Sequence, residues 1–461
     1  MSRLPAFALV GSLVLGLSAT GMLALAARAD GADAWCYERV MGRAFGPRAE
    51  LATTLCIVVQ QVGSLVGFLV AISDFLQALA PRALPPTALL VALAGVVLWP
   101  LSLLPMLQLL WLPNALSIAA ICAVAGVVVS RAAQPGSTCP AAPGGDEQPI
   151  ELWAWPAGGE QILEVVPILV FGFMAHIQTP LVSCEVRQAC AGGGVGGGST
   201  GGSAGGSAGG GGGGGGGAAG AHAAAQRVMR AAVLCTLGGC TALYTATALA
   251  GVACYGSGVR GDILANLGVD ASAAGGGDPL AAFAGAAMAT HLALAYPVLL
   301  YPLLVSTDAL LGVRGPAAAA DAAAAADADP GFDGADLALL ASKRRRRCSL
   351  RWRAARSGAI ICATLAIALV AGQRLNVVFA ALGGSSGACL VCWFPAALLA
   401  QDGRALLRLR SHHDQTGGRG GRWRGVRLLV AAAAMAALGV AAAAGTVVTL
   451  WCQIRGGCRH D

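Results

Sequence analysis

Three polar side chains stand in the middle of an apolar run and are candidates for binding a small polar ligand. They are His176, Gln178 and Thr179. Gly172 and Pro180 bracket them within the run 161–185. A proline interrupts helical hydrogen bonding because it has no N–H and its ring clashes with the carbonyl four residues earlier. The pattern predicts a broken helix whose freed main-chain groups and polar side chains form a binding site. A simple kink around a packed histidine is the alternative.

Two other apolar runs carry polar residues. In the run 280–311, His291 precedes Pro297 and Pro302, which predicts a kinked helix facing protein, with His291 either functional or merely hydrogen-bonded in the interior. In the run 50–79, a stripe of small and polar residues lies on one helical face. It consists of Gln60, Ser64 and Gly67, with Gly63 beside it. Such a stripe either packs closely against another helix or borders a cavity.

The composition is that of a membrane protein. Of the 461 residues, 56% are hydrophobic and 11% charged, whereas soluble proteins carry about 25% charged residues. The net charge of +7 does not indicate a nucleic-acid partner, because the basic residues stand between apolar runs. No HExxH, Walker A, GxSxG or paired CxxC motif is present, so we predict no catalytic residues, no metal site and no enzyme. The single CxxC, Cys389 and Cys392, is interpreted as apolar helix.

Ten apolar runs are predicted to cross a membrane as helices, since about 20 apolar residues span a bilayer. They are residues 6–28, 50–79, 87–108, 114–131, 161–185, 228–255, 280–311, 357–373, 376–400 and 426–451. The first run also resembles a signal peptide, and we expect it to be a retained span. The predicted fold class is therefore an all-α polytopic membrane protein, and the lipid bilayer is its expected environment.

Two low-complexity segments divide the chain. Residues 191–226 are predicted to form a Gly/Ala-rich linker, and residues 312–356 an Ala/Asp-rich and basic linker. This leaves five spans in residues 1–190, two in 227–311 and three in 357–461. Both linkers are expected in the cytoplasm.

Sidedness follows from Lys and Arg, which concentrate in alternate loops. These loops are residues 28–49, 186–230, 312–356 and 401–427. The positive-inside rule makes them cytoplasmic and places both termini on the opposite side. KRRRR at 343–347 is interpreted as part of this signal; a nuclear address or an anionic-lipid patch is the alternative.

Four stretches of the chain carry a family resemblance. They are AFGPRAELATTLCIVVQQVGSLVGFLVAISDFL (44–76), VVPILVFGFMAHIQTPLVSCEV (165–186), RVMRAAVLCTLGGCTALYTATALAGVACYGSGVRGDILANL (227–267) and YPVLLYPLLVSTDALL (296–311). In this order they resemble the third, sixth, seventh and eighth helices of the amino acid/auxin permease family, nearest its sodium-coupled neutral amino acid transporter branch.

The resemblance implies a leucine-transporter-like bundle of two inverted repeats, with free amino acids bound where helices are broken. Small neutral amino acids are the implied substrates, and the plasma membrane or a vacuolar or endolysosomal membrane is the implied location. No obligate protein partner is implied. The substrate-binding residues expected on this basis are Phe171, Gly172, Phe173, His176, Gln178, Thr179, Gln60 and Ser64.

The sequence departs from this family in two informative ways. RLPAF at residues 3–7 resembles the end of the family's first helix, and the break expected before it is absent, which predicts a chain lacking that helix through an incomplete gene model. The eighth helix lacks the hydroxyl expected of the family's sodium site, because no Ser or Thr lies between Thr290 and Ser306. Proton coupling or uniport is therefore expected instead of sodium coupling. The candidates for carrying the proton are His176, His291 and Glu185.

Two functions of different classes remain. The first is a secondary active carrier of amino acids that works by alternating access, with no cofactor beyond a coupling ion. The second is a non-transporting, amino-acid-responsive receptor or scaffold, which the missing first helix and hydroxyl would favour.

Overall fold

The computed structural model describes residues 4–29, 36–79, 85–103, 111–134, 159–192, 214–256, 259, 262–268, 278–311, 335–371, 375–408 and 420–454. These residues are almost entirely helical and include no strand. Eight helical stretches among them are long and apolar enough to cross a membrane. They are α1 (Leu4–Arg28), α3 (Pro47–Leu79), α6 (Trp111–Ala133), α9 (Gly214–Tyr255), α11 (Pro279–Leu310), α13 (Ala335–Ala371), the stretch from α14 (Leu375–Leu382) through η5 (Gly383–Gly387) and η6 (Cys389–Trp393) to α15 (Phe394–Arg408), and α16 (Gly420–Ile454).

Two shorter apolar stretches fall in the remaining predicted runs. One is a continuous helix made of α4 (Pro86–Leu93), the π-helical η1 (Ala94–Leu98) and α5 (Trp99–Ser102). The other is α7 (Gly159–Gly172). Each of the ten predicted runs thus contains helix in its described part, and the all-α polytopic fold class is confirmed. The inverted-repeat relationship stays a prediction.

Helix extends into both predicted linkers. α9 already begins at Gly214 and α13 at Ala335, so residues 214–226 and 335–356 are helical. The physical reason is composition: the end of the first linker is rich in Ala, and that of the second in Ala, Leu, Lys and Arg, which are strong helix formers. The rest of the two linkers, residues 193–213 and 312–334, lies outside the described part of the chain.

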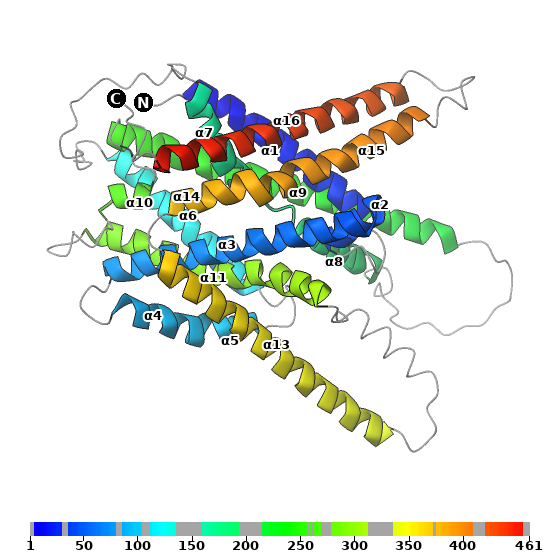
Figure 1. Cartoon of the computed structure of the whole chain (residues 1–461), viewed down its shortest axis with the longest axis horizontal. Coiled ribbons are helices and arrows are strands. Elements are labelled where there is room, and N and C mark those ends of the chain that lie inside the picture. Colours follow the sequence, from blue (N-terminus) through cyan, green and yellow to red (C-terminus); the bar gives the residue numbers. More distant parts are fainter. Residues whose placement is uncertain are drawn as a thin grey trace, which may run out of the picture.

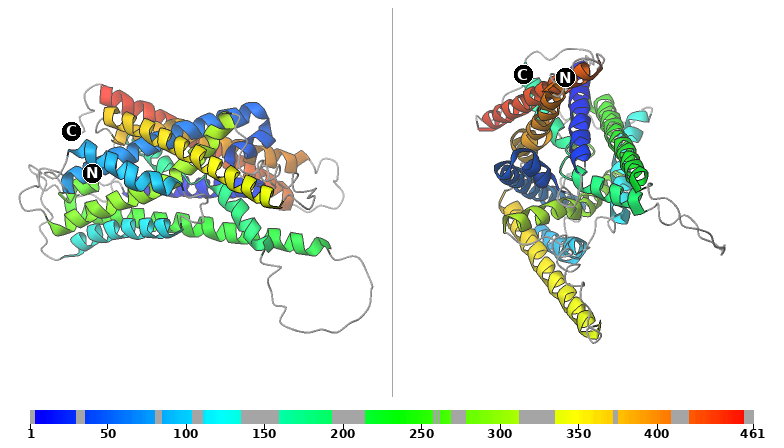
Figure 2. Two further views of the ribbon diagram at one scale, coloured as in Figure 1. Left: turned by 90° about the horizontal axis from the view of Figure 1, so that it is seen from below. Right: turned by 90° about the vertical axis from the view of Figure 1, so that its right-hand side faces the viewer.

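The two ends of the helix bundle separate as the charge pattern predicts. In Figure 1 the helix ends next to the four basic loops, including the junction of α1 with α2 (Tyr37–Phe45) and the start of α16, lie on the right. The starts of α1 and α11 and the end of α16 lie on the left. The first part of α13 projects beyond the other helices, as the right-hand view of Figure 2 also shows. Along the lower edge of the left-hand view, α6 and α9 pack side by side.

Buried apolar side chains form two main clusters. The first joins α1, α7, α9, α15 and α16, and the second joins α3, α4, α11 and α13. A smaller cluster at the end of α1 connects the two through α2, whose Tyr37, Val40 and Met41 are buried. α2 therefore lies where the two parts of the bundle meet.

α7 is held closely by its neighbours. A Cβ atom at Gly383 of η5 would clash with the carbonyl oxygen of Pro167, and one at Gly445 of α16 would clash with that of Leu163. Only glycine permits such an approach of two backbones. The first half of the broken helix is thus fixed against η5 and α16.

Candidate functional site

The helix predicted over residues 161–185 is interrupted. Its first part, α7, ends at Gly172, and its second part, α8 (Thr179–Gly192), begins one residue before Pro180. The segment between them, residues 173–178, contains turns and no helix. The predicted break is therefore confirmed, and the alternative of a mere kink is wrong.

Three consecutive main-chain N–H groups of this break lack a backbone acceptor among the described residues. In the described part of the chain, those of His176, Ile177 and Gln178 donate to no backbone carbonyl. They directly precede the first turn of α8, where the helix dipole is positive. N–H groups at a helix N-terminus form a site that suits an anion such as a carboxylate.

Side chains from two other helices fix the carbonyl groups of the break. The hydroxyl of Ser18 on α1 donates to the Phe173 carbonyl over 3.0 Å, and the hydroxyl of Tyr244 on α9 donates to the Gly172 carbonyl over 3.2 Å. The Phe173 carbonyl also accepts a hydrogen bond of 3.2 Å from the Ala175 N–H. The negative end of α7 therefore faces the positive end of α8 across the break.

His176 faces α1, α15 and α16. Its side chain is fully buried, and a Cβ atom at Gly21 would lie 3.0 Å from its Nε2 atom. The same point is bordered by Pro395 and Met435. Neither ring nitrogen has a hydrogen-bond partner among the described residues.

Gln178 lies on a different side of the break, beside a cavity of about 20 Å³. The lining residues come from the start of α2, from the break and α8, and from the second half of α11. They are Cys36, Glu38, Ile177, Gln178, Leu181, Tyr301, Pro302, Val305 and Ser306. A cavity of this volume holds about one water molecule. A larger ligand enters only if the surrounding helices separate.

Glu38 is the residue of this cavity that sequence reasoning missed. It is only 2% exposed, and Ser306 donates a hydrogen bond of 3.4 Å to its Oε1 atom. The two residues lie 268 positions apart, so only the tertiary fold joins them. The local signal, an acidic residue in the first turn of an amphipathic helix, is common to many solvent-exposed helices.

The two aromatic side chains predicted for the site pack against opposite neighbours. Phe171 stacks on Phe379 of α14 with ring centroids 4.7 Å apart, and Phe173 meets Tyr244 edge-on at 5.7 Å. Thr179 is buried and its hydroxyl donates to the carbonyl of the residue four positions earlier. These side chains support the break from both sides.

Gln60 and Ser64 lie on α3, which packs against η5. Both are buried, and the hydroxyl of Ser386 in η5 donates to Oε1 of Gln60 over 2.7 Å. Next to them, Cβ atoms at Gly63 and Gly67 would contact side chains of α14. Of the two readings of the stripe, close packing against another helix is the one observed.

The remaining proton-carrier candidates also occupy separate places. His291 on α11 pairs through Nδ1 with the hydroxyl of Ser117 on α6 at 2.9 Å, which is the arrangement of a hydrogen-bonded interior histidine. Glu185 is half-buried on α8, four residues after Leu181 of the cavity. Among the described residues, no group of three His, Cys, Asp or Glu side chains could hold a metal ion.

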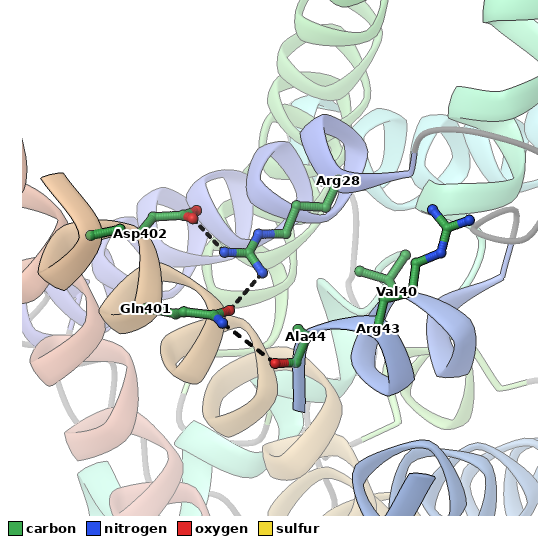
Figure 3. Close-up of a pocket in the computed structure, with 7 residues that line it drawn as sticks. Arg28, Val40, Arg43, Ala44, Gln401 and Asp402 are labelled. Atoms are coloured by element: carbon green, nitrogen blue, oxygen red, sulfur yellow. Dashed lines mark hydrogen bonds and ion pairs between the residues drawn. The ribbon is translucent and has the colours of Figure 1, made fainter. Parts of the chain in front are cut away.

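Polar contacts join α1, α2 and α15 at the end of the bundle that carries the basic loops. Figure 3 shows Arg28 reaching both Asp402, with which it forms an ion pair, and Gln401, which accepts a hydrogen bond of 2.9 Å. The amide of Gln401 in turn donates to the Ala44 carbonyl at 3.4 Å. The Arg43 side chain points away from this group. We call these contacts of Arg28, Gln401, Asp402 and Ala44 the polar clamp; they border a cavity of about 450 Å³.

A family model described as transmembrane amino acid transporter protein matches residues 7–190 and 221–400. The gap in this match coincides with the Gly/Ala-rich segment, and the broken helix lies inside the first matched part. No curated protein matches the chain. The nearer branch and the loss of the first helix stay predictions. With a match over most of its length and a polytopic helical fold, the chain belongs to the transmembrane amino acid transporter protein family.

Proposed function

We propose that this transporter is a secondary active carrier of small neutral amino acids, coupled to protons or working as a uniporter, and not coupled to sodium. The observation that carries the proposal is the run of three N–H groups without backbone partners between α7 and α8. An amino acid is a zwitterion, and the two helix ends offer complementary partial charges to its two groups.

The substrate's carboxylate would accept hydrogen bonds from the N–H groups of residues 176–178. Its ammonium group would lie toward the carbonyl end of α7, near Gly172 and Phe173. Main-chain groups bind every amino acid alike, so selectivity among side chains depends on the surrounding residues. The aromatic rings of Phe171 and Phe173 restrict that space, which supports a small and uncharged side chain.

The proposal that transport is not coupled to sodium is supported by α11, where no Ser or Thr lies between Thr290 and Ser306. Thr290 donates to the Ala286 carbonyl, and Ser306 donates to Glu38. Between them Ala293 is buried in the apolar cluster with α3. Sodium prefers oxygen ligands, as hard cations do. The side chain of Ala293 offers it none.

Alternating access would move the cluster containing α7 relative to the cluster containing α3 and α11. The two parts meet at the break, at α2 and at the polar clamp. Opening toward the predicted cytoplasmic side would separate α2 from α11 and widen the small cavity. Such motion is driven only by a difference in the free energy of substrate or ion binding between the two states. The receptor alternative is not favoured, because the matched family is one of transporters.

Uptake by proteoliposomes containing the full chain tests this proposal. Labelled glycine, alanine, serine and leucine are offered at two external pH values, with and without a sodium gradient. We expect uptake of the small amino acids that does not depend on sodium. Uptake that follows a sodium gradient at fixed pH would refute the coupling mode, and no saturable uptake of any amino acid would refute the carrier itself.

A pair of proline variants tests the role of the break. Pro180→Ala restores an N–H and removes the clash with the His176 carbonyl, so it favours helix through the break and should abolish uptake. Pro167→Ala is the control, because this proline lies inside the continuous helix α7. This variant should retain most of the uptake. Equal uptake by the two variants would contradict a binding role for the break.

A further inference from the structure

Glu38 is a buried carboxyl group at the junction of the two parts of the bundle. It lies in the first turn of α2 and faces α11, from which Ser306 donates its hydroxyl. No Lys or Arg side chain forms a salt bridge with it in the described part of the chain. A carboxylate removed from water without a cation is strongly destabilised, so such a group takes up a proton.

The surroundings of Glu38 favour its neutral form. Burial raises its pKa, more than its own backbone N–H and the hydrogen bonds from Cys36 and Ser306 lower it. The charge of nearby Glu50 raises the pKa further. Other titratable groups line the same cavity or lie close to Tyr301, which also lines it. None of them is a cation paired with Glu38. They are Cys36 just before α2, Tyr301 on α11, Glu185 on α8 and Arg353 on α13, which lies 6.0 Å from the centre of the Tyr301 ring.

The cavity links Glu38 to the broken helix. Gln178, the last residue of the break, and Glu38 line the same small space. The other end of α2 is bound to α15, because Gln401 donates to the Ala44 carbonyl in the polar clamp. A movement that opens this end of the bundle therefore changes how much water reaches Glu38.

We propose that Glu38 is the proton-binding residue of the carrier, neutral while the cavity is closed and ionised when the cavity opens to the cytoplasm. This inference rests on the proposed proton-coupled function and gives it a residue that the histidines do not supply. The neutral carboxyl stays hydrogen-bonded to Ser306, beside the cavity that Gln178 also lines. The ionised carboxylate is stable only in contact with water, so the proton leaves only after the cavity has opened.

The proton balance of one cycle is simple. On opening, the O–H bond of the Glu38 carboxyl breaks, its electron pair stays on the carboxylate, and the proton passes to cytoplasmic water. The emptied site then turns to the opposite side, where the carboxylate takes a proton from water that reaches it through the break and the cavity beside Gln178. A new O–H bond forms there, and the carboxyl is neutral again before the next closure. One proton thus crosses the membrane in each transport cycle.

Glu38→Gln imitates the permanently neutral form and separates two transport modes. In proteoliposomes, an inward pH gradient should drive accumulation of the best-transported amino acid by the wild type but not by E38Q, because the amide has no proton to release. Counterflow at equal pH, in which labelled substrate exchanges for unlabelled substrate inside, needs no proton release and should persist in E38Q. Glu50→Gln removes a carboxylate that pairs with Arg39 outside the cavity and should keep both modes. Its pH dependence should move to lower pH, because the charge of Glu50 no longer raises the pKa of Glu38.

The outcomes distinguish this inference from the proposed function. Accumulation by E38Q equal to that of the wild type overturns the role of Glu38 alone. A wild type that exchanges substrate but ignores the pH gradient overturns proton coupling, and the role of Glu38 with it.

Should E38Q lose both modes, Ser306→Ala decides. It removes a hydrogen bond that stabilises the ionised carboxylate, so the pH midpoint of uptake should move to higher pH, and an unmoved midpoint overturns the inference.

Discussion

The hydroxyl of Ser18 donates a hydrogen bond of 3.0 Å to the carbonyl of Phe173, although 155 residues separate the two in the sequence. The carbonyl belongs to the unwound segment and has no place in a continuous helical ladder. Ser18 is fully buried in the middle of α1. One hydroxyl on a neighbouring helix therefore helps to keep the binding segment unwound.

Ser18→Ala should destabilise the protein by about 1–3 kcal/mol, because it leaves a buried carbonyl with one donor fewer. Uptake should fall as well, since the unwound segment loses a support. The midpoint of thermal unfolding, followed by tryptophan fluorescence, measures the first effect. Thr20→Ala is the matched control: this exposed hydroxyl bonds only to the Gly16 carbonyl of its own helix. If both variants lose stability and uptake to the same extent, Ser18 does not support the unwound segment.

Gly21→Ala should destabilise the protein by about 1–3 kcal/mol through overpacking. Its Cβ atom would lie 2.9 Å from the Met435 side chain and 3.0 Å from Nε2 of His176. Gly16→Ala on the same helix has nothing within 4 Å and should stabilise the protein by about 0.5–1 kcal/mol, as alanine does in a helix. Thermal unfolding of the two variants checks the opposite signs. A stabilising Gly21→Ala would mean that His176 does not pack against α1.

The raised pKa of Glu38 predicts that stability declines with pH. A buried carboxyl binds its proton more tightly in the folded than in the unfolded chain, so its contribution is complete below the unfolded pKa of about 4.3 and is lost as pH rises through the folded pKa. Glu38→Gln lacks this loss. Unfolding midpoints should therefore agree at about pH 4 and favour E38Q at about pH 8. If the wild type gains stability over E38Q as pH rises, the carboxylate has a cationic partner and the assignment is wrong.

The ion pair of the polar clamp should contribute little to stability. Its side chains are 24% exposed for Arg28 and 42% for Asp402, so solvent screens the attraction. A double-mutant cycle of Arg28→Ala and Asp402→Ala should give a coupling energy of at most about 1 kcal/mol, which declines with added salt. Both single variants should also bring the carrier to its open state more often. A larger coupling that salt leaves unchanged would instead indicate a desolvated structural pair.

Much of the fold follows from local chemistry. Runs of about 20 apolar residues must form helices in lipid, because every main-chain group needs a partner there. The break follows from Pro180, which cannot donate a helical hydrogen bond, and this effect acts within one turn. The alternation of basic loops likewise depends only on the order of charges along the chain, and the helix ends are arranged accordingly.

The contents of the site depend on contacts between distant segments. By itself the sequence determined ten helices, one broken helix and the polar residues at the break. Only the tertiary structure decided that His176 turns toward Gly21 while Gln178 turns toward α2 and α11, and that Gln60 bonds to Ser386. It alone revealed Glu38, whose surroundings come from α2, α8 and α11. The physical reason is that helix formation is set by neighbouring residues, whereas burial and hydrogen bonding of a side chain are set by whichever helices pack against it.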